Sequence, residues 1–199
     1  MLTTTNVNRM TPQDPVELIR QLADRAAADH GSGAADLARA VDALAQESVD
    51  LDTNELLDRG IHLVAEHTGA DGAVLYRYDH DRVRVVRRLR SGWSPRPEEL
   101  PSNWFPWSLG QVSPTRFLFV ADSRNLPIGP GASPVLGDIG VASCVHLPVL
   151  ERSHPVGALQ LFWAEPLSAW DDDLGPTLRN LGRFMVARVK DPNVQFSLT

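Results

Sequence analysis

Cys144 and His146 are the residues of this 199-residue chain whose types and spacing could most directly do chemistry. They alternate along a predicted strand, so both side chains point to the same face, where a thiolate and an imidazole could bind a metal or do redox work. Two ligands do not complete a metal site, and Cys144 is the only cysteine, so the chain offers no second thiol to resolve an oxidised one. A buried, inert thiol beside a hydrogen-bonded core histidine is the simpler interpretation. We expect no metal, no cofactor and no catalytic residue.

Four further polar residues stand where a ligand could use them. Tyr76 and Gln160 interrupt otherwise apolar predicted strands, so each needs a hydrogen-bond partner if it is buried, and a ligand is one candidate. Asp122 and Arg124 follow the end of another predicted strand, where a loop can present a carboxylate and a guanidinium to a polar ligand. A surface ion pair or a turn cap explains this second pair more simply.

Residues 91–114 combine five prolines with three tryptophans, Trp93, Trp104 and Trp107. This stretch is too rich in proline for the interior of a sheet and too aromatic for a disordered linker. We expect a folded excursion. Its rings either wall a pocket and stack on a flat ligand, or form a local cluster that caps the sheet.

Signatures of common enzymes and of nucleic-acid binding are missing from the sequence. It has no Ser-His-Asp order, no phosphate-binding glycine loop and no His-Glu-x-x-His spacing. The 19 basic and 25 acidic residues give a net charge of −6, which disfavours a polyanionic partner. The five arginines between residues 82 and 90 are therefore interpreted as solvated charges that guard an edge strand. We expect a non-catalytic protein that does not bind nucleic acid.

The composition is that of an ordinary globular chain. Hydrophobic residues make up 43% and charged residues 22%, enough to bury a core. The sequence has no run of the ~20 apolar residues that a membrane span needs, and its first residues lack the pattern of a signal peptide. A single cysteine suits a reducing compartment. We expect a cytoplasmic protein without membrane contact.

The order of predicted elements is helices, then strands, then a long helix. Residues 1–14 are predicted to be a flexible tail and residues 15–50 a helical extension, followed by one domain over residues 51–190 and a second tail over residues 191–199. A capped start at residues 52–55 opens a helix that Thr68-Gly69 ends. Two hairpins are predicted at 72–79 with 82–89 and at 140–150 with 156–163, with a short strand at 117–121 and a closing helix over 170–189. This is an α+β architecture: a twisted antiparallel sheet of five to six strands, apolar on both faces and so expected to be flanked by helices on both.

Two apolar helix stripes are candidates for a homodimer surface. They are Leu37, Val41 and Leu44 in the helical extension and Leu178, Leu181 and Met185 in the closing helix. Packing against the sheet of the same chain is the alternative for each stripe.

Three segments in a fixed order resemble a GAF domain. They are Ile-Gly-Val-Ala-Ser-Cys-Val-His-Leu-Pro-Val at residues 139–149, Val-Gly-Ala-Leu-Gln-Leu-Phe at residues 156–162, and Trp-Asp-Asp-Asp at residues 170–173. The strands predicted at 72–79 and 119–122 are also similar to strands of that family. The resemblance covers residues 54–189 and implies a small-molecule pocket on one face of the sheet and a helical dimer surface on the other. The related PAS fold is the structural alternative, and it would lack the long closing helix.

The resemblance implies a regulatory or sensory domain of bacterial-type signal transduction that passes its bound state to a signalling protein or output domain. The candidate ligand contacts are Tyr76, Trp93, Trp104, Trp107, Phe119, Asp122, Arg124, Cys144, His146 and Gln160. The alternatives are a protein-interaction scaffold without a ligand, and a redox enzyme or a haem or bilin sensor on the same fold. A single thiol disfavours the family's reductase chemistry, and the place of Cys144 inside a strand disfavours bilin attachment.

Overall fold

A single antiparallel sheet organises the chain. The computed structural model describes residues 33–79, 82–89, 99–101, 117–125 and 140–189. Within these ranges six strands pair in the order β3-β2-β1-β6-β5-β4. They are β1 (Gly72–Asp79), β2 (Arg82–Leu89), β3 (Glu99–Pro101), β4 (Leu118–Val120), β5 (Ser143–Glu151) and β6 (His154–Trp163). The predicted α+β fold with five to six antiparallel strands is confirmed.

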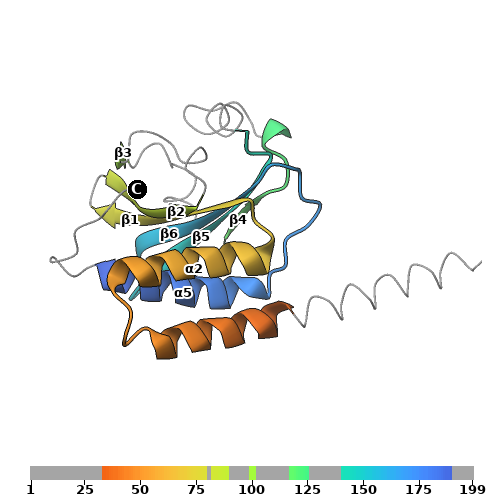
Figure 1. Ribbon diagram of the computed structural model, residues 1–199. Helices are drawn as coiled ribbons and strands as arrows, with labels where there is room; N and C mark the ends of the chain where they lie inside the picture. The colour runs from red at the N-terminus through yellow and green to blue at the C-terminus, as the bar shows by residue number, and fades with distance from the viewer. Residues whose placement is uncertain (1–32, 80–81, 90–98, 102–116, 126–139, 190–199) are drawn as a thin grey trace, which may run out of the picture.

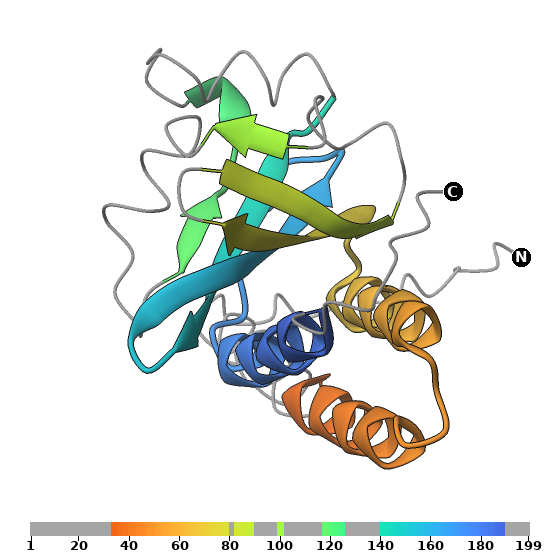
Figure 2. The same cartoon turned by 90° about the vertical axis from the view of Figure 1, so that its left-hand side faces the viewer.

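The helices form a layer on one side of this sheet (Figures 1 and 2). The layer contains α2 (Thr53–Thr68), α5 (Leu174–Val189) and a helix over residues 33–47, called here the N-terminal helix. Helices were predicted on both faces, but every α-helix within the described ranges lies on the same one. The apolar pattern of the strands correctly indicated cover on both faces, because both are buried, but such a pattern does not require the cover to be helical.

Helix α2 begins and ends where local sequence chemistry predicts. Asp52 accepts a hydrogen bond from the Glu55 backbone N–H at 2.9 Å, and Glu55 accepts one in return from the backbone of Asp52. Gly69 ends the helix in the left-handed conformation at φ 63°, which glycine adopts without steric cost.

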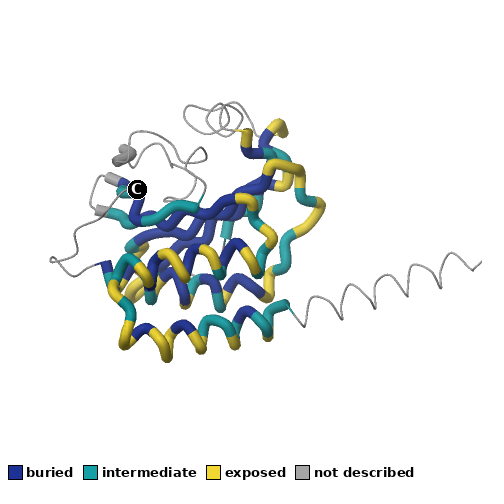
Figure 3. Tube along the Cα trace, viewed as in Figure 1, coloured by how far each residue is buried: buried dark blue, intermediate teal, exposed yellow. Residues whose placement is uncertain are grey.

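The main hydrophobic core fills the space between this helical layer and the sheet (Figure 3). Five of the six candidate dimer residues are buried in it, with at most 5% exposure: Leu37, Leu44, Leu178, Leu181 and Met185. The sixth, Val41, is partly buried against the same core. The dimer surface predicted from these side chains is therefore wrong, because the stripes pack within their own chain.

Hydrogen bonds attach the N-terminal helix and its following turn to the other two helices. Arg59 of α2 donates to Glu47 at 2.6 Å, and Arg188 of α5 donates to the Ser48 carbonyl at 2.8 Å. The part of the predicted extension that the structure describes is thus packed onto the domain. The predictions for residues 1–32 and 191–199 lie outside the described residues.

Within the described residues, strand β2 is the sheet edge that its arginines indicated over only part of its length. Strand β3, from the proline-rich excursion, pairs with it over Arg82–Arg84 and takes the outer position. An edge strand tolerates Pro101 because one side of its backbone forms no ladder. Arg87 of β2 instead turns toward α2, where it donates to Asp58 at 2.7 Å and to the Asn54 carbonyl at 3.2 Å.

The observed bounds of the β5–β6 turn and of α5 differ by a few residues from those predicted. The β5–β6 pairing extends to Glu151 opposite His154, so the turn contains only Arg152 and Ser153, both at positive φ as a two-residue hairpin turn requires. Helix α5 starts at Leu174 rather than at residue 170, because the Asp171 side chain closes a preceding turn by accepting from the Asp173 N–H at 3.0 Å.

Candidate functional site

Five uncharged polar side chains lie on the sheet face opposite the helical layer. Strand alternation sets the pattern: β1 contributes Tyr76 and Tyr78, β5 contributes Cys144 and His146, and β6 contributes Gln160. We call these five residues the polar cluster. Their apolar neighbours on the same face form a second, smaller core that includes Val74, Val85, Ala158 and Phe162. Three sequence-predicted polar residues, Tyr76, His146 and Gln160, are at most 3% exposed there.

Tyr78 and His146 form a hydrogen bond across the middle of this face. The Tyr78 hydroxyl lies 3.3 Å from His146 Nε2, although β6 separates their strands. Ala158 of β6 pairs with Tyr76, two residues before Tyr78, and with Pro148, two residues after His146. The diagonal between Tyr78 and His146 therefore passes over Ala158, whose small side chain leaves room for the contact.

Cys144 and Gln160 form the second polar contact of the cluster. A side-chain hydrogen bond joins them, and Gln160 is directly opposite His146 in the β5–β6 register. The Oε1 atom of Gln160 is buried and has no hydrogen-bond partner in the part of the chain that the structure describes. A buried acceptor in that state is costly unless something donates to it.

Burial shifts the pKa values of Tyr76, Cys144 and His146 further from pH 7, each in the direction that favours the neutral side chain. Desolvation lowers the pKa of His146 from 6.5 to about 4, so its imidazole carries no charge at that pH. Burial raises the pKa of Cys144 from 9.0 to about 12, against a smaller opposing effect of its bond to Gln160. Burial, with the nearby Tyr78 and Cys144, also raises the pKa of the Tyr76 hydroxyl. The cluster is a hydrogen-bonding site without formal charge.

The remaining candidate contacts do not join the cluster. Phe119 pairs with Val145 and packs against the core on the helical side, so its prediction as a ligand contact is wrong for this face. A strand of alternating side chains sends Phe119 to the opposite face from Leu118 and Val120. Trp93, Trp104 and Trp107 lie outside the described residues.

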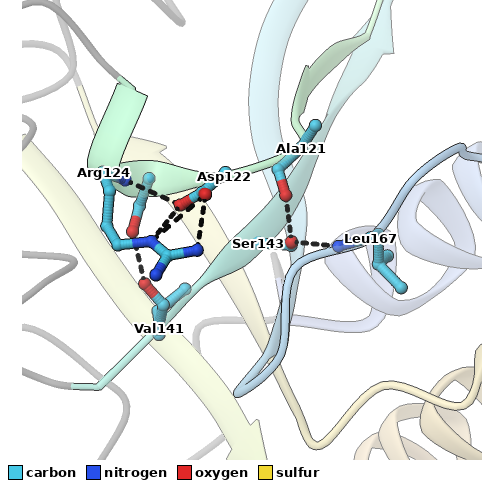
Figure 4. Close-up of polar contacts among 7 residues, drawn as sticks. Ala121, Asp122, Arg124, Val141, Ser143 and Leu167 are labelled. Atoms are coloured by element: carbon cyan, nitrogen blue, oxygen red, sulfur yellow. Dashed lines mark hydrogen bonds and ion pairs between the residues drawn. The ribbon is translucent and has the colours of Figure 1, made fainter.

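Asp122 and Arg124 pair with each other at the end of β4 (Figure 4). Arg124 Nη2 donates to Asp122 Oδ2 at 2.7 Å, and this bond lowers the pKa of the carboxyl. The Arg124 side chain is 74% exposed, so the surface ion pair is the observed arrangement. Beside it, Ser143 donates to the Ala121 carbonyl at 2.5 Å and accepts from the Leu167 N–H at 2.7 Å, which fastens the segment after β6 to the sheet.

Tyr78 is not among the ligand contacts predicted from the sequence. The signal was available, because Tyr78 follows Tyr76 by two residues on one strand and must share its face. What no local pattern could show is that Tyr78 reaches a histidine 68 residues away.

A groove of about 370 Å³ lies elsewhere, between the β5–β6 hairpin and α5. Its lining is Glu151, Val156, Asn180, Arg183, Phe184, Val186 and Ala187. None of the predicted ligand contacts belongs to it. Across the described ranges, no three histidine, cysteine, aspartate or glutamate side chains come together as a metal site, and no helix has the length and apolarity to cross a membrane.

Comparison with known proteins identifies the fold. The profile of the family described as GAF domain matches residues 52–185. Three solved structures with the same fold illustrate its range. The phycocyanobilin-bound GAF domain of a cyanobacterial phytochrome has 16% identity and a TM-score of 0.60, covering 77% of this chain and 92% of that one. The free methionine-R-sulfoxide reductase of Neisseria meningitidis, in complex with its substrate, has 15% identity and a TM-score of 0.55, covering 76% and 84%. A GAF domain/HD domain protein of Geobacter sulfurreducens has 16% identity and a TM-score of 0.53, covering 69% and 92%. No curated protein sequence matches this chain.

Proposed function

Because the chain belongs to the GAF domain family, we propose that it is a non-catalytic regulatory module that binds a small molecule on the face of the polar cluster. Members of a fold differ widely in function, so the proposal depends on the site rather than on the fold. The observation that carries it is the gathering of five polar side chains on one buried sheet face, with an open acceptor at Gln160. Two structures of the same fold contain a small molecule, a bilin in one and a substrate in the other.

Strand β1 connects the proposed ligand-binding face to the helical layer. Arg77 stands between Tyr76 and Tyr78 and points to the opposite face, where it donates to the carbonyl of Val189, the last residue of α5, at 3.2 Å. A cation there also favours the negative end of the helix dipole. A ligand that shifts Tyr76 or Tyr78 moves the backbone that carries Arg77. We propose that this displacement biases the end of α5, and that a signalling protein or output domain detects the change.

Redox catalysis and pigment binding fit this chain less well. The Cys144 thiol is fully buried and its pKa is raised, whereas a redox-active cysteine is accessible and readily ionised. His146, the other residue a haem or bilin could use, already bonds to Tyr78. We therefore propose an uncoloured ligand and no enzymatic turnover. A cytoplasmic homodimer remains part of the proposal, with its surface unassigned because the predicted stripes are buried.

Native mass spectrometry of the purified chain, with an absorption spectrum, tests the proposal. We expect a mass excess over the polypeptide that denaturation removes, or failing retention, a rise in melting temperature with members of a metabolite panel. A native mass equal to that of the polypeptide, with no response to the panel, would instead support the ligand-free interaction scaffold. A visible absorption band would support the pigment sensor.

A further inference from the structure

We propose that the ligand of the polar cluster is an uncharged molecule with a flat apolar body that donates one N–H or O–H hydrogen bond to Gln160 Oε1. This inference rests on the proposed function and specifies the chemistry of the ligand at that site.

The hydrogen-bonding requirement comes from Gln160. Its side chain is 3% exposed. Gln160 lies on β6, a central strand of the sheet, with His146 opposite it on β5 and Val74 opposite it on β1. One end of the amide is engaged by Cys144, and Oε1 is left without a donor in the described part of the chain. Because Oε1 can only accept, the complementary group on a ligand must be a donor.

The requirement for neutrality comes from the groups around Gln160. Of the buried residues around it, Tyr76 and Cys144 carry neutral side chains at pH 7, and burial lowers the pKa of His146 to about 4, so this imidazole is neutral as well. An ionised ligand placed among them would lose its hydration, and these side chains supply no countercharge.

Arg88 is the charged residue that the register places on the same face. It stands opposite Val74 on β2, two strands from Gln160, and it already has an interaction partner. A carboxylate-bearing probe tests directly whether an anion binds beside Arg88.

The flat shape follows from the apolar residues beside the acceptor. Phe162 is two residues from Gln160 on the same face and pairs with Cys144, while Val74 stands across from Gln160. Both side chains are at most 1% exposed, so a ligand reaches them only by replacing what covers them, and a planar ring can do so while its edge presents the donor.

Three probes that share the indole ring separate these requirements. Indole is neutral and carries one N–H donor, 1-methylindole lacks the donor, and indole-3-acetate adds a negative charge. Titrations of ¹⁵N-labelled protein that follow the Gln160 side-chain amide signal localise binding to this site. We expect the dissociation constant of indole to be about tenfold or more lower than that of either other probe, because each mismatch leaves a buried polar group unpaired or a charge unsolvated.

Gln160→Met keeps the side-chain length but removes the acceptor, so it should bring indole and 1-methylindole to equal affinity. For this variant, binding is followed through the signals of Ala158 and Phe162. Gln46→Met makes the same substitution at an exposed position of the N-terminal helix and should preserve the tenfold preference. If Gln160→Met does not fold, the comparison of the three probes on the wild type decides alone.

The outcomes separate this inference from the proposed function. Equal wild-type affinities for indole and 1-methylindole, or tightest binding of indole-3-acetate, overturn the inference. The same holds if no probe shifts the Gln160 signal at millimolar concentration. A small molecule found by native mass spectrometry would still support the function in each case, whereas its absence there together with no response to the metabolite panel would remove both.

Discussion

The hydroxyl of Tyr78 lies 3.3 Å from His146 Nε2, and the two residues come from strands that are not neighbours in the sheet. This bond crosses the face that also bears Gln160 and Cys144, so it fixes the orientation of the imidazole within the polar cluster.

Removing the Tyr78 hydroxyl should loosen this contact without disturbing the sheet. Tyr78→Phe keeps the ring and leaves one His146 nitrogen without its partner, so we expect a loss of about 1 kcal/mol in the free energy of unfolding. Urea denaturation measures the loss, and the ¹⁵N shift of His146 Nε2 should change. An unchanged shift would show that the two side chains do not bond in solution.

Acidification should destabilise the fold through His146. The unfolded chain takes up this proton near pH 6.5, but the folded chain resists it until about pH 4. Between these two pH values the unfolded state binds more protons than the folded state. The contribution of His146 to the free energy of unfolding is therefore complete above pH 6.5 and falls by about 3 kcal/mol as the pH drops to 4. Urea denaturation from pH 7.5 to 4 measures it. His146→Gln should remove this part of the slope, while His154→Gln, at an exposed residue, should retain it. A ¹³C titration of His146 with a midpoint near 6.5 would contradict the expectation.

Cys144 should be inert in the folded protein. Its side chain is fully buried and its pKa is about 12, so almost no thiolate is present at pH 8. We expect a thiol-specific disulfide reagent to label it only as fast as the protein opens, and to label it at once in urea. Rapid labelling of the native protein would revive the redox-enzyme alternative.

Gly157 should tolerate no side chain. A Cβ there would lie 2.3 Å from the Tyr76 carbonyl oxygen and 3.1 Å from Cγ2 of Val186. Val186 belongs to α5, so the position lies where the sheet packs against this helix. Gly157→Ala is expected to cost about 1–3 kcal/mol of unfolding free energy, from overpacking. Gly175→Ala meets no atom within 4 Å in the first turn of α5 and should be neutral or slightly stabilising. Equal stability of the two variants would contradict this packing.

Leu44 should behave as a core residue rather than as a dimer contact. Leu44→Ala is expected to cost about 2–5 kcal/mol, because the side chain is 5% exposed, and to leave the oligomeric state unchanged. Val49→Ala, at a residue 84% exposed, should change neither quantity much. Light scattering together with thermal unfolding distinguishes the cases: a dimer lost without loss of stability would restore the original dimer prediction.

Local sequence determined the kind of the long helices and strands and the face of each residue within its strand, but not the short strand β3 or the 3-10 turn at Ser123–Asn125. The capping residues at 52 and 55 and the glycine at 69 delimit α2, because these interactions involve residues only a few positions apart. The strict alternation of side chains likewise placed Cys144 with His146, and Tyr76 with Tyr78.

Tertiary structure decided which of those faces meet. The helices could have covered either apolar face, and their position sends Phe119 toward the core and leaves Gln160 on the opposite face. The apolar stripes of two helices could have met a second copy, but pack within the chain instead. Tyr78 contacts His146 only because β6 lies between β1 and β5 in the sheet. This pairing depends on the free energy of the whole sheet, so the sequence around either residue does not indicate it.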